Sequence, residues 1–66
     1  MKLWIARDDN GLFLFKEKPI EVYLNGIGYC YELGDEICQL KDDIFPEVTY
    51  KNSPRQVEIN YVMNGL

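Results

Sequence analysis

Few side chains in this 66-residue sequence could do acid–base or metal chemistry. There is no histidine, the usual general base near neutral pH, and the paired carboxylates fall in segments with the composition of turns. The only two cysteines, Cys30 and Cys38, lack the second pair that a thiolate zinc site requires. No flanking cluster of cations would lower their thiol pKa. We therefore expect no catalytic residue, no metal ligand and no cofactor.

Aromatic and cationic side chains are the stronger candidates, because together they could bind a ligand. Tyrosine and tryptophan rings stack on bases, and arginine donates paired hydrogen bonds to phosphate. A pocket for a small phosphorylated nucleotide needs both, ideally where two subunits meet. Each of two candidates also has a purely structural interpretation. Trp4 could belong to the core instead of stacking on a ligand, and Arg7 could pair with Asp8 or Asp9 at the rim instead of binding phosphate. The candidate ligand-binding residues are Trp4, Arg7, Tyr23, Tyr29, Tyr31 and Arg55.

Short segments rich in Val, Ile, Tyr, Phe and Trp, separated by DDNG, NGIG, GD and KNSP, are typical of antiparallel β structure. We expect one domain over residues 1–66, mostly β, formed as a small antiparallel sheet or a partly open barrel of five to six short strands. One short helical turn is expected in KDDIFPEV, ending at Pro46. Strands are predicted over residues 21–24, 48–50 and 56–63.

Residues 3–7 and 12–16 are expected to form a hairpin across a loop built from DDNG. This register sets Trp4 opposite Phe15, whereas a two-residue Asn-Gly turn would lose that aromatic pair. In either register both faces of the hairpin are apolar.

A second hairpin is predicted in YCYELGDEICQL, closed by a type II′ turn at Gly34 and Asp35. Its register sets Tyr31 opposite Cys38, so that Cys30 and Cys38 lie on opposite faces and cannot form a disulfide.

The apolar side chains elsewhere in the chain suffice to cover one face of the first hairpin, and we expect the other face to stay bare. A contiguous patch of Trp, Phe and Leu seldom stays exposed on a soluble monomer. A domain of this length also hides only ~60% of the surface of its unfolded chain. A homo-oligomer joined through sheet faces or edges is therefore expected.

Charge and hydropathy disfavour two classes of partner. Eleven acidic against seven basic residues give a net charge of −4, which opposes binding to duplex nucleic acid. No apolar run approaches the ~20 residues of a membrane span. Without a signal-peptide pattern or a disulfide framework, the sequence is typical of a cytoplasmic protein.

Two blocks of the sequence carry a resemblance: WIARD followed by GLFLF and KP, and FPEVTYKNSPRQVEI near the other end. They resemble a family of small uncharacterised bacteriophage and prophage proteins with a WIARD…G…L…KP opening and an FPEVT…NSP…VEI block. The resemblance covers both ends of the chain and not residues 21–39. It implies a phage accessory protein that acts in the host bacterial cytoplasm and counters host defence. It assigns no binding residue.

These observations predict a non-enzymatic protein that sequesters a small nucleotide-derived immune signal in an oligomer. The alternative is an anti-CRISPR-like inhibitor that binds a host defence protein, since an acidic surface can compete for a groove that normally holds nucleic acid. A virion or assembly role also stays open.

Overall fold

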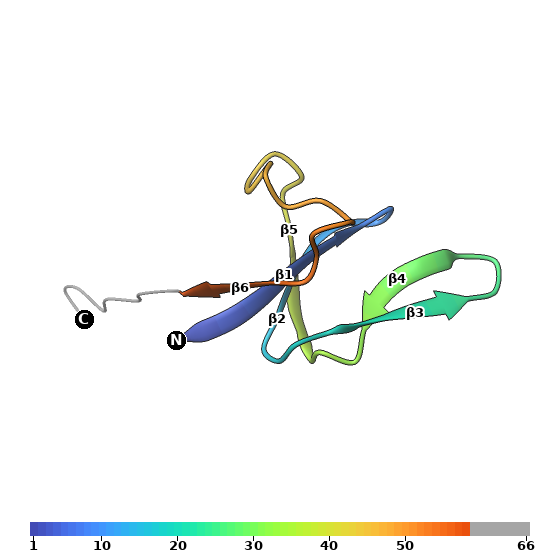
Figure 1. The fold of residues 1–66 in the computed structure, drawn as a ribbon, viewed down its shortest axis with the longest axis horizontal. Coiled ribbons are helices and arrows are strands. Elements are labelled where there is room, and N and C mark those ends of the chain that lie inside the picture. The colour runs from blue at the N-terminus through green and yellow to red at the C-terminus, as the bar shows by residue number, and fades with distance from the viewer. Residues whose placement is uncertain (59–66) are drawn as a thin grey trace.

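The computed structural model describes residues 1–58, which form six strands in two antiparallel sheets (Figure 1). The larger sheet has the order β5-β2-β1-β6, and the smaller pairs β3 with β4. The mostly β prediction is confirmed, as antiparallel sheets that do not close into a barrel. The strands are β1 (Lys2–Asp8), β2 (Gly11–Phe15), β3 (Ile20–Leu24), β4 (Gly28–Glu32), β5 (Glu36–Leu40) and β6 (Arg55–Glu58).

The β1–β2 hairpin has the register predicted from the sequence. Trp4 lies opposite Phe15, and the ladder continues to Asp8 opposite Gly11. The Asp8 side chain accepts a hydrogen bond of 2.8 Å from the backbone N–H of Asn10, which stabilises the turn. Gly11 has a φ of 131°, a conformation that other residues rarely adopt.

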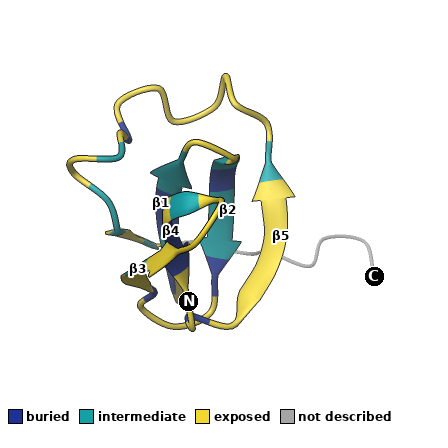
Figure 2. Cartoon of the chain, turned by 90° about the vertical axis from the view of Figure 1, so that its right-hand side faces the viewer, coloured by how far each residue is buried: buried dark blue, intermediate teal, exposed yellow. Residues whose placement is uncertain are grey.

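Both faces of the β1–β2 hairpin are covered within the chain, so the expected bare face is not found. One face holds a core of Ile5, Leu12 and Val48, in which Val48 comes from the segment between β5 and β6. The other face holds Ala6 and Phe15 under Tyr31 of β4. Figure 2 shows buried positions concentrated on β1 and β2. The apolar surplus that suggested an oligomer is therefore used inside one subunit.

The predicted hairpin at Gly34 and Asp35 does not form. Instead β4 pairs with β3 across the NGIG turn, and β5 pairs with β2. The chain changes sheets at residues 33–35, where Leu33 and Asp35 have φ values of 66° and 59°. Cys30 and Cys38 thus lie in different sheets, as free thiols. The competing pairing is favoured because it places the Tyr31 ring on Phe15 and Leu40 beside the Leu12 core.

The segment from residue 41 to residue 54 contains turns where a helical turn and a short strand were predicted. Ile44 N–H donates to the Lys41 carbonyl at 3.3 Å, and Val48 N–H donates to the Phe45 carbonyl at 2.9 Å. Phe45 has a φ of 51°, which is incompatible with a right-handed helix at that position. Residues 48–50 join no sheet. The last predicted strand begins as β6, and its remainder lies outside the described residues.

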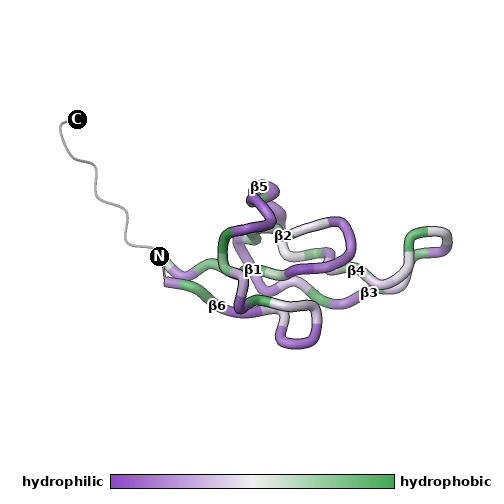
Figure 3. Tube along the Cα trace, turned by 90° about the horizontal axis from the view of Figure 1, so that it is seen from above, coloured by the Kyte–Doolittle hydropathy of each residue, from purple (hydrophilic) through white to green (hydrophobic). Residues whose placement is uncertain are grey.

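The β3–β4 hairpin projects from the larger sheet, and its tip carries apolar residues (Figures 1 and 3). It is tied to that sheet at the corner, where Glu17 N–H donates to the Gly34 carbonyl at 2.8 Å.

Gly34 has no room for a side chain at this corner. A Cβ would lie 2.6 Å from the Glu17 carbonyl oxygen and 2.9 Å from a Phe15 ring carbon. We expect Gly34→Ala to lower the free energy of unfolding by about 1–3 kcal/mol through overpacking. Urea denaturation followed by circular dichroism measures the change. The neighbouring Leu33→Ala is the control, since that side chain is 77% exposed; equal stability of the two variants would contradict the prediction.

Candidate functional site

The β3–β4 hairpin gathers tyrosines on one of its faces. The register sets Tyr23 opposite Tyr29 and Glu21 opposite Tyr31, so these four side chains share a face. The Tyr23 and Tyr29 rings meet edge to face at 5.1 Å and are 60% and 57% exposed. We call these four residues, with Tyr50 from the β5–β6 segment, the tyrosine face.

Tyr50 joins the tyrosine face through two contacts. Its hydroxyl donates to the Glu21 carboxylate, and its ring centroid lies 5.6 Å from that of Tyr31. Beside it is an open groove of about 330 Å³, lined by Asp9, Gly28, Tyr29 and Tyr50. The tyrosine face therefore places aromatic rings beside the Asp9 carboxylate, and a cation could bind there.

Tyr31 holds this arrangement together and is itself buried. Its hydroxyl is 2.9 Å from the Ser53 carbonyl and 3.2 Å from the Tyr50 carbonyl, and donates to both. Its backbone N–H donates to the Asp8 carboxylate at 3.3 Å. Tyr31, one of the predicted ligand-binding residues, is therefore a buried residue that binds the backbone of Tyr50 and Ser53.

Burial and nearby carboxylates raise the pKa of three side chains in this region. The hydrogen bond to Glu21, aided by burial, raises the pKa of Tyr50 above its usual value. Burial and the charges of Glu21 and Asp8 raise the pKa of Tyr31. Burial and the carboxylates of Glu32 and Asp8 raise the pKa of the Cys30 thiol. At neutral pH the two hydroxyls are thus neutral donors, and Cys30 is a thiol rather than a thiolate nucleophile.

Arg7 does not reach the tyrosine face. Its Nε donates to the Val48 carbonyl at 2.6 Å, and one Nη donates to the carbonyls of Ile44 and Phe45 at 3.2 Å each. The guanidinium therefore fastens the β5–β6 segment to β1. It has neither of the partners considered from the sequence, since its donors point at backbone carbonyls rather than at Asp8 or Asp9.

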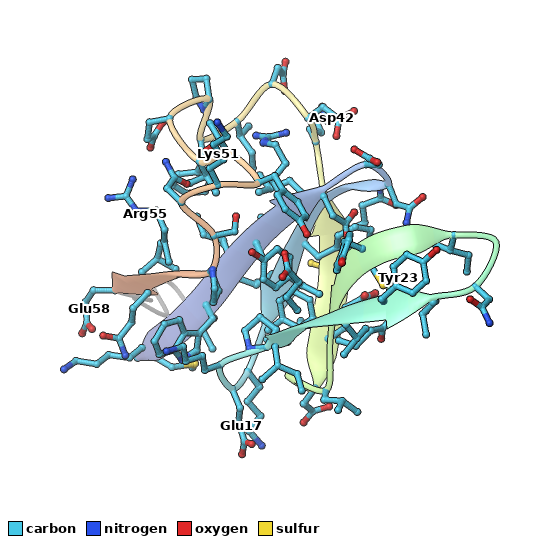
Figure 4. The ribbon with its side chains drawn as sticks, turned by 45° about the vertical axis from the view of Figure 1, so that its right-hand side comes forward. Glu17, Tyr23, Asp42, Lys51, Arg55 and Glu58 are labelled. Carbon is cyan, nitrogen blue, oxygen red and sulfur yellow. The ribbon has the colours of Figure 1, made fainter. Side chains whose placement is uncertain are left out.

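Trp4 and Arg55 lie on opposite faces of the larger sheet, and Trp4 packs against the buried cluster of Ala6, Phe15 and Tyr31. Arg55 pairs with Ile5 in the ladder, so it shares the Ile5 face of the larger sheet, while Trp4 lies on the other face. Figure 4 shows Arg55 on β6 well separated from Tyr23 on β3. Trp4 is half-buried, with the Lys18 ammonium 5.5 Å from its ring centroid. Of the six candidates, Tyr23, Tyr29 and Tyr31 share one face of the β3–β4 hairpin, and Trp4 packs against the cluster that contains Tyr31.

Sequence reasoning did not select Asp9 or Gly28, which line the groove. The NGIG turn before Tyr29 was the available signal for Gly28. Gly28 has a positive φ, and because it has no side chain it leaves space beside the Tyr29 ring. Asp9 lies next to Asp8, whose carboxylate accepts a hydrogen bond from the β4 backbone.

Within residues 1–58, no group of three or more His, Cys, Asp or Glu side chains is arranged to hold a metal ion. In the same range no helix is long and apolar enough to cross a membrane. Comparisons with protein-family models, curated proteins and solved structures found no match. The function is therefore argued from the site.

Proposed function

We propose that this protein acts by binding, and that its tyrosine face contacts lysine or arginine side chains of a target protein. Exposed tyrosines are enriched at protein interfaces, where a rigid ring contributes a large contact area. The Tyr23 and Tyr29 rings are of this kind, and the groove beside Tyr29 contains the Asp9 carboxylate. Aromatic faces and carboxylates both attract cations.

The observation that carries this proposal is the composition of the groove. Among residues 1–58, Asp9 is the only charged residue that lines the groove, so a phosphate placed there would meet a like charge and no cationic donor from this part of the chain. The guanidinium of Arg7 is already bound to three carbonyls. Sequestration of a nucleotide-derived signal therefore has less support than recognition of a protein.

The setting of the proposal comes from the sequence resemblance to small phage proteins. In that setting the target is a bacterial defence protein, and its bound surface is a basic groove that normally holds nucleic acid. The net charge of −4 favours such an encounter, because opposite charges steer association.

An NMR titration with defined probes tests the recognition chemistry. We expect a short arginine-rich peptide to shift the amide signals of Asp9, Gly28 and Tyr29, and a cyclic dinucleotide to leave them unchanged. Tyr29→Ala should weaken peptide binding roughly 2- to 30-fold, the effect of losing a cation–π contact. The exposed Leu33→Ala is the matched control. Shifts with the dinucleotide alone, or none with the peptide, would overturn the proposal.

A binding experiment in host extract tests the setting. We expect a host protein to be retained by the wild-type protein and by Leu33→Ala, and to be lost with the double variant Tyr23→Ala, Tyr29→Ala. The retained protein should bind nucleic acid, and this protein should compete for that site. Recovery of a nucleotide from the denatured wild-type protein, with equal retention by all variants, would favour sequestration instead.

A further inference from the structure

The free edge of β3 is the feature that the proposed function does not use. In the two-stranded sheet, the outer edge of β4 lies against the end of β1, where Tyr31 N–H donates to the Asp8 carboxylate. Within residues 1–58, no third strand joins the outer edge of β3. An unpaired edge is a template for another strand.

The hydrogen-bond pattern identifies which backbone groups of β3 are free. Tyr31 N–H points away from β3, because it binds Asp8 on the other side of β4. Backbone groups alternate in direction along an antiparallel ladder, and Tyr31 lies opposite Glu21. The N–H and C=O groups of Glu21 and Tyr23 therefore point outward from the β3 edge, while those of Ile20, Val22 and Leu24 point toward β4.

This edge also lacks the usual features that prevent strand addition. β3 has the sequence IEVYL, with no lysine and no proline within it. Its only charged side chain, Glu21, accepts a hydrogen bond from the Tyr50 hydroxyl, so the carboxylate is directed toward Tyr50. Ile20 and Leu24, at its two ends, are 51% and 38% exposed.

We propose that β3 pairs antiparallel with β3 of a second copy of this chain, about a two-fold axis at Val22. In this register Glu21 exchanges both backbone hydrogen bonds with the partner's Tyr23, and Tyr23 does so with the partner's Glu21. Val22 lies against the partner's Val22, and Ile20 lies against the partner's Leu24. The outward groups identified above are the ones that this register uses, so its hydrogen bonds and its apolar pairs are compatible.

Size predicts that this dimer is concentration-dependent. Two five-residue strands bury less than the roughly 1,200–2,000 Å² of a stable protein interface. The contact nevertheless converts two marginal two-stranded sheets into one four-stranded sheet. Tyr23 and Tyr29 of both copies then share one continuous face. The dimer does not depend on the basic target proposed above, but it would present that target with two tyrosine faces.

Charge exchange at the ends of β3 tests both the pairing and its register. The double variant Ile20→Lys, Leu24→Lys places like charges opposite each other across the dimer, whereas Ile20→Lys, Leu24→Glu places opposite charges there. Within one chain these positions are roughly 13 Å apart, so either variant is tolerated similarly by the monomer. Sedimentation velocity over a concentration series should show reversible dimers for the wild type and for the Ile20→Lys, Leu24→Glu variant. The Ile20→Lys, Leu24→Lys variant should be monomeric. Identical behaviour of both variants, or a monomeric wild type at millimolar concentration, would overturn the proposal.

A disulfide experiment gives an independent measurement. In a Cys38→Ser background, Ile20→Cys and Leu24→Cys are made as separate proteins, and Cys30 stays buried. The register predicts that the oxidised mixture forms a covalent heterodimer and that neither protein alone does so. Efficient homodimers of either variant, or no cross-link in the mixture, would contradict it. The peptide titration described above reports separately on the tyrosine face, so loss of the dimer and loss of peptide binding are distinguishable.

Discussion

Replacing Phe15 with alanine should lower the free energy of unfolding by about 3–5 kcal/mol, the largest effect that we expect from a single substitution. Phe15 is fully buried and packs in one cluster with Ala6 and Tyr31. Its ring also lies against the corner at Gly34, so its removal opens space between the two sheets. Domains are stable by about 0.05–0.15 kcal/mol per residue, or roughly 3–10 kcal/mol for 66 residues, so the substitution would remove a large part of the stability.

Urea denaturation followed by circular dichroism and by Trp4 fluorescence measures this effect. Leu33→Ala removes an apolar side chain from an exposed position, and it should change stability by less than about 0.5 kcal/mol. A loss below about 1 kcal/mol for Phe15→Ala would mean that the ring is not part of the core.

The second large effect should follow the loss of Arg7. Hydrogen bonds to charged groups contribute about 1.5–3 kcal/mol each, and Arg7 serves carbonyls of three residues in the β5–β6 segment. Discounting for partial exposure, we expect Arg7→Met to destabilise the protein by about 2–4 kcal/mol. The change should be concentrated in that segment, so the Val48 amide should exchange with solvent much faster.

Two further variants define what Arg7 contributes. Arg7→Lys should recover only part of the stability, because an ammonium cannot reproduce the planar fork of a guanidinium. Arg55→Met removes the same charge from an exposed position on β6 and should be near neutral. If Arg7→Met and Arg55→Met behaved alike, Arg7 would not be the residue that fastens the segment.

One predicted hairpin, β1–β2, forms and the other, β4–β5, does not, and this difference shows how much of the fold was predictable. The β1–β2 register follows from local information, because DDNG supplies the turn and Trp4 and Phe15 supply a cross-strand pair. The sequence around Gly34 looks equally local, yet β4 and β5 separate there. Which strand a five-residue strand pairs with depends on how its side chains are buried against the rest of the molecule. A short stretch of sequence does not contain that information.

The candidate site was predictable by residue type and not by position. Tyr23 and Tyr29 were selected as aromatic platforms, and the structure brings them together. Arg7 was selected as a phosphate ligand, but its acceptors are backbone carbonyls 37 to 41 residues further along the chain. Backbone carbonyls are present at every residue, so the sequence carries no mark of such a partner.

The corner at Gly34 has a consequence for how this chain can change. The chain leaves the larger sheet after Phe15 and re-enters it at Glu36, and these two residues are paired. Hydrogen bonds from Lys16 N–H to the Asp35 carbonyl and from Glu17 N–H to the Gly34 carbonyl close the gap between exit and return. The intervening hairpin therefore joins the larger sheet at one corner and through Tyr31. We expect its exposed positions to accept substitutions without a change in the supporting sheet, provided that Tyr31 is kept.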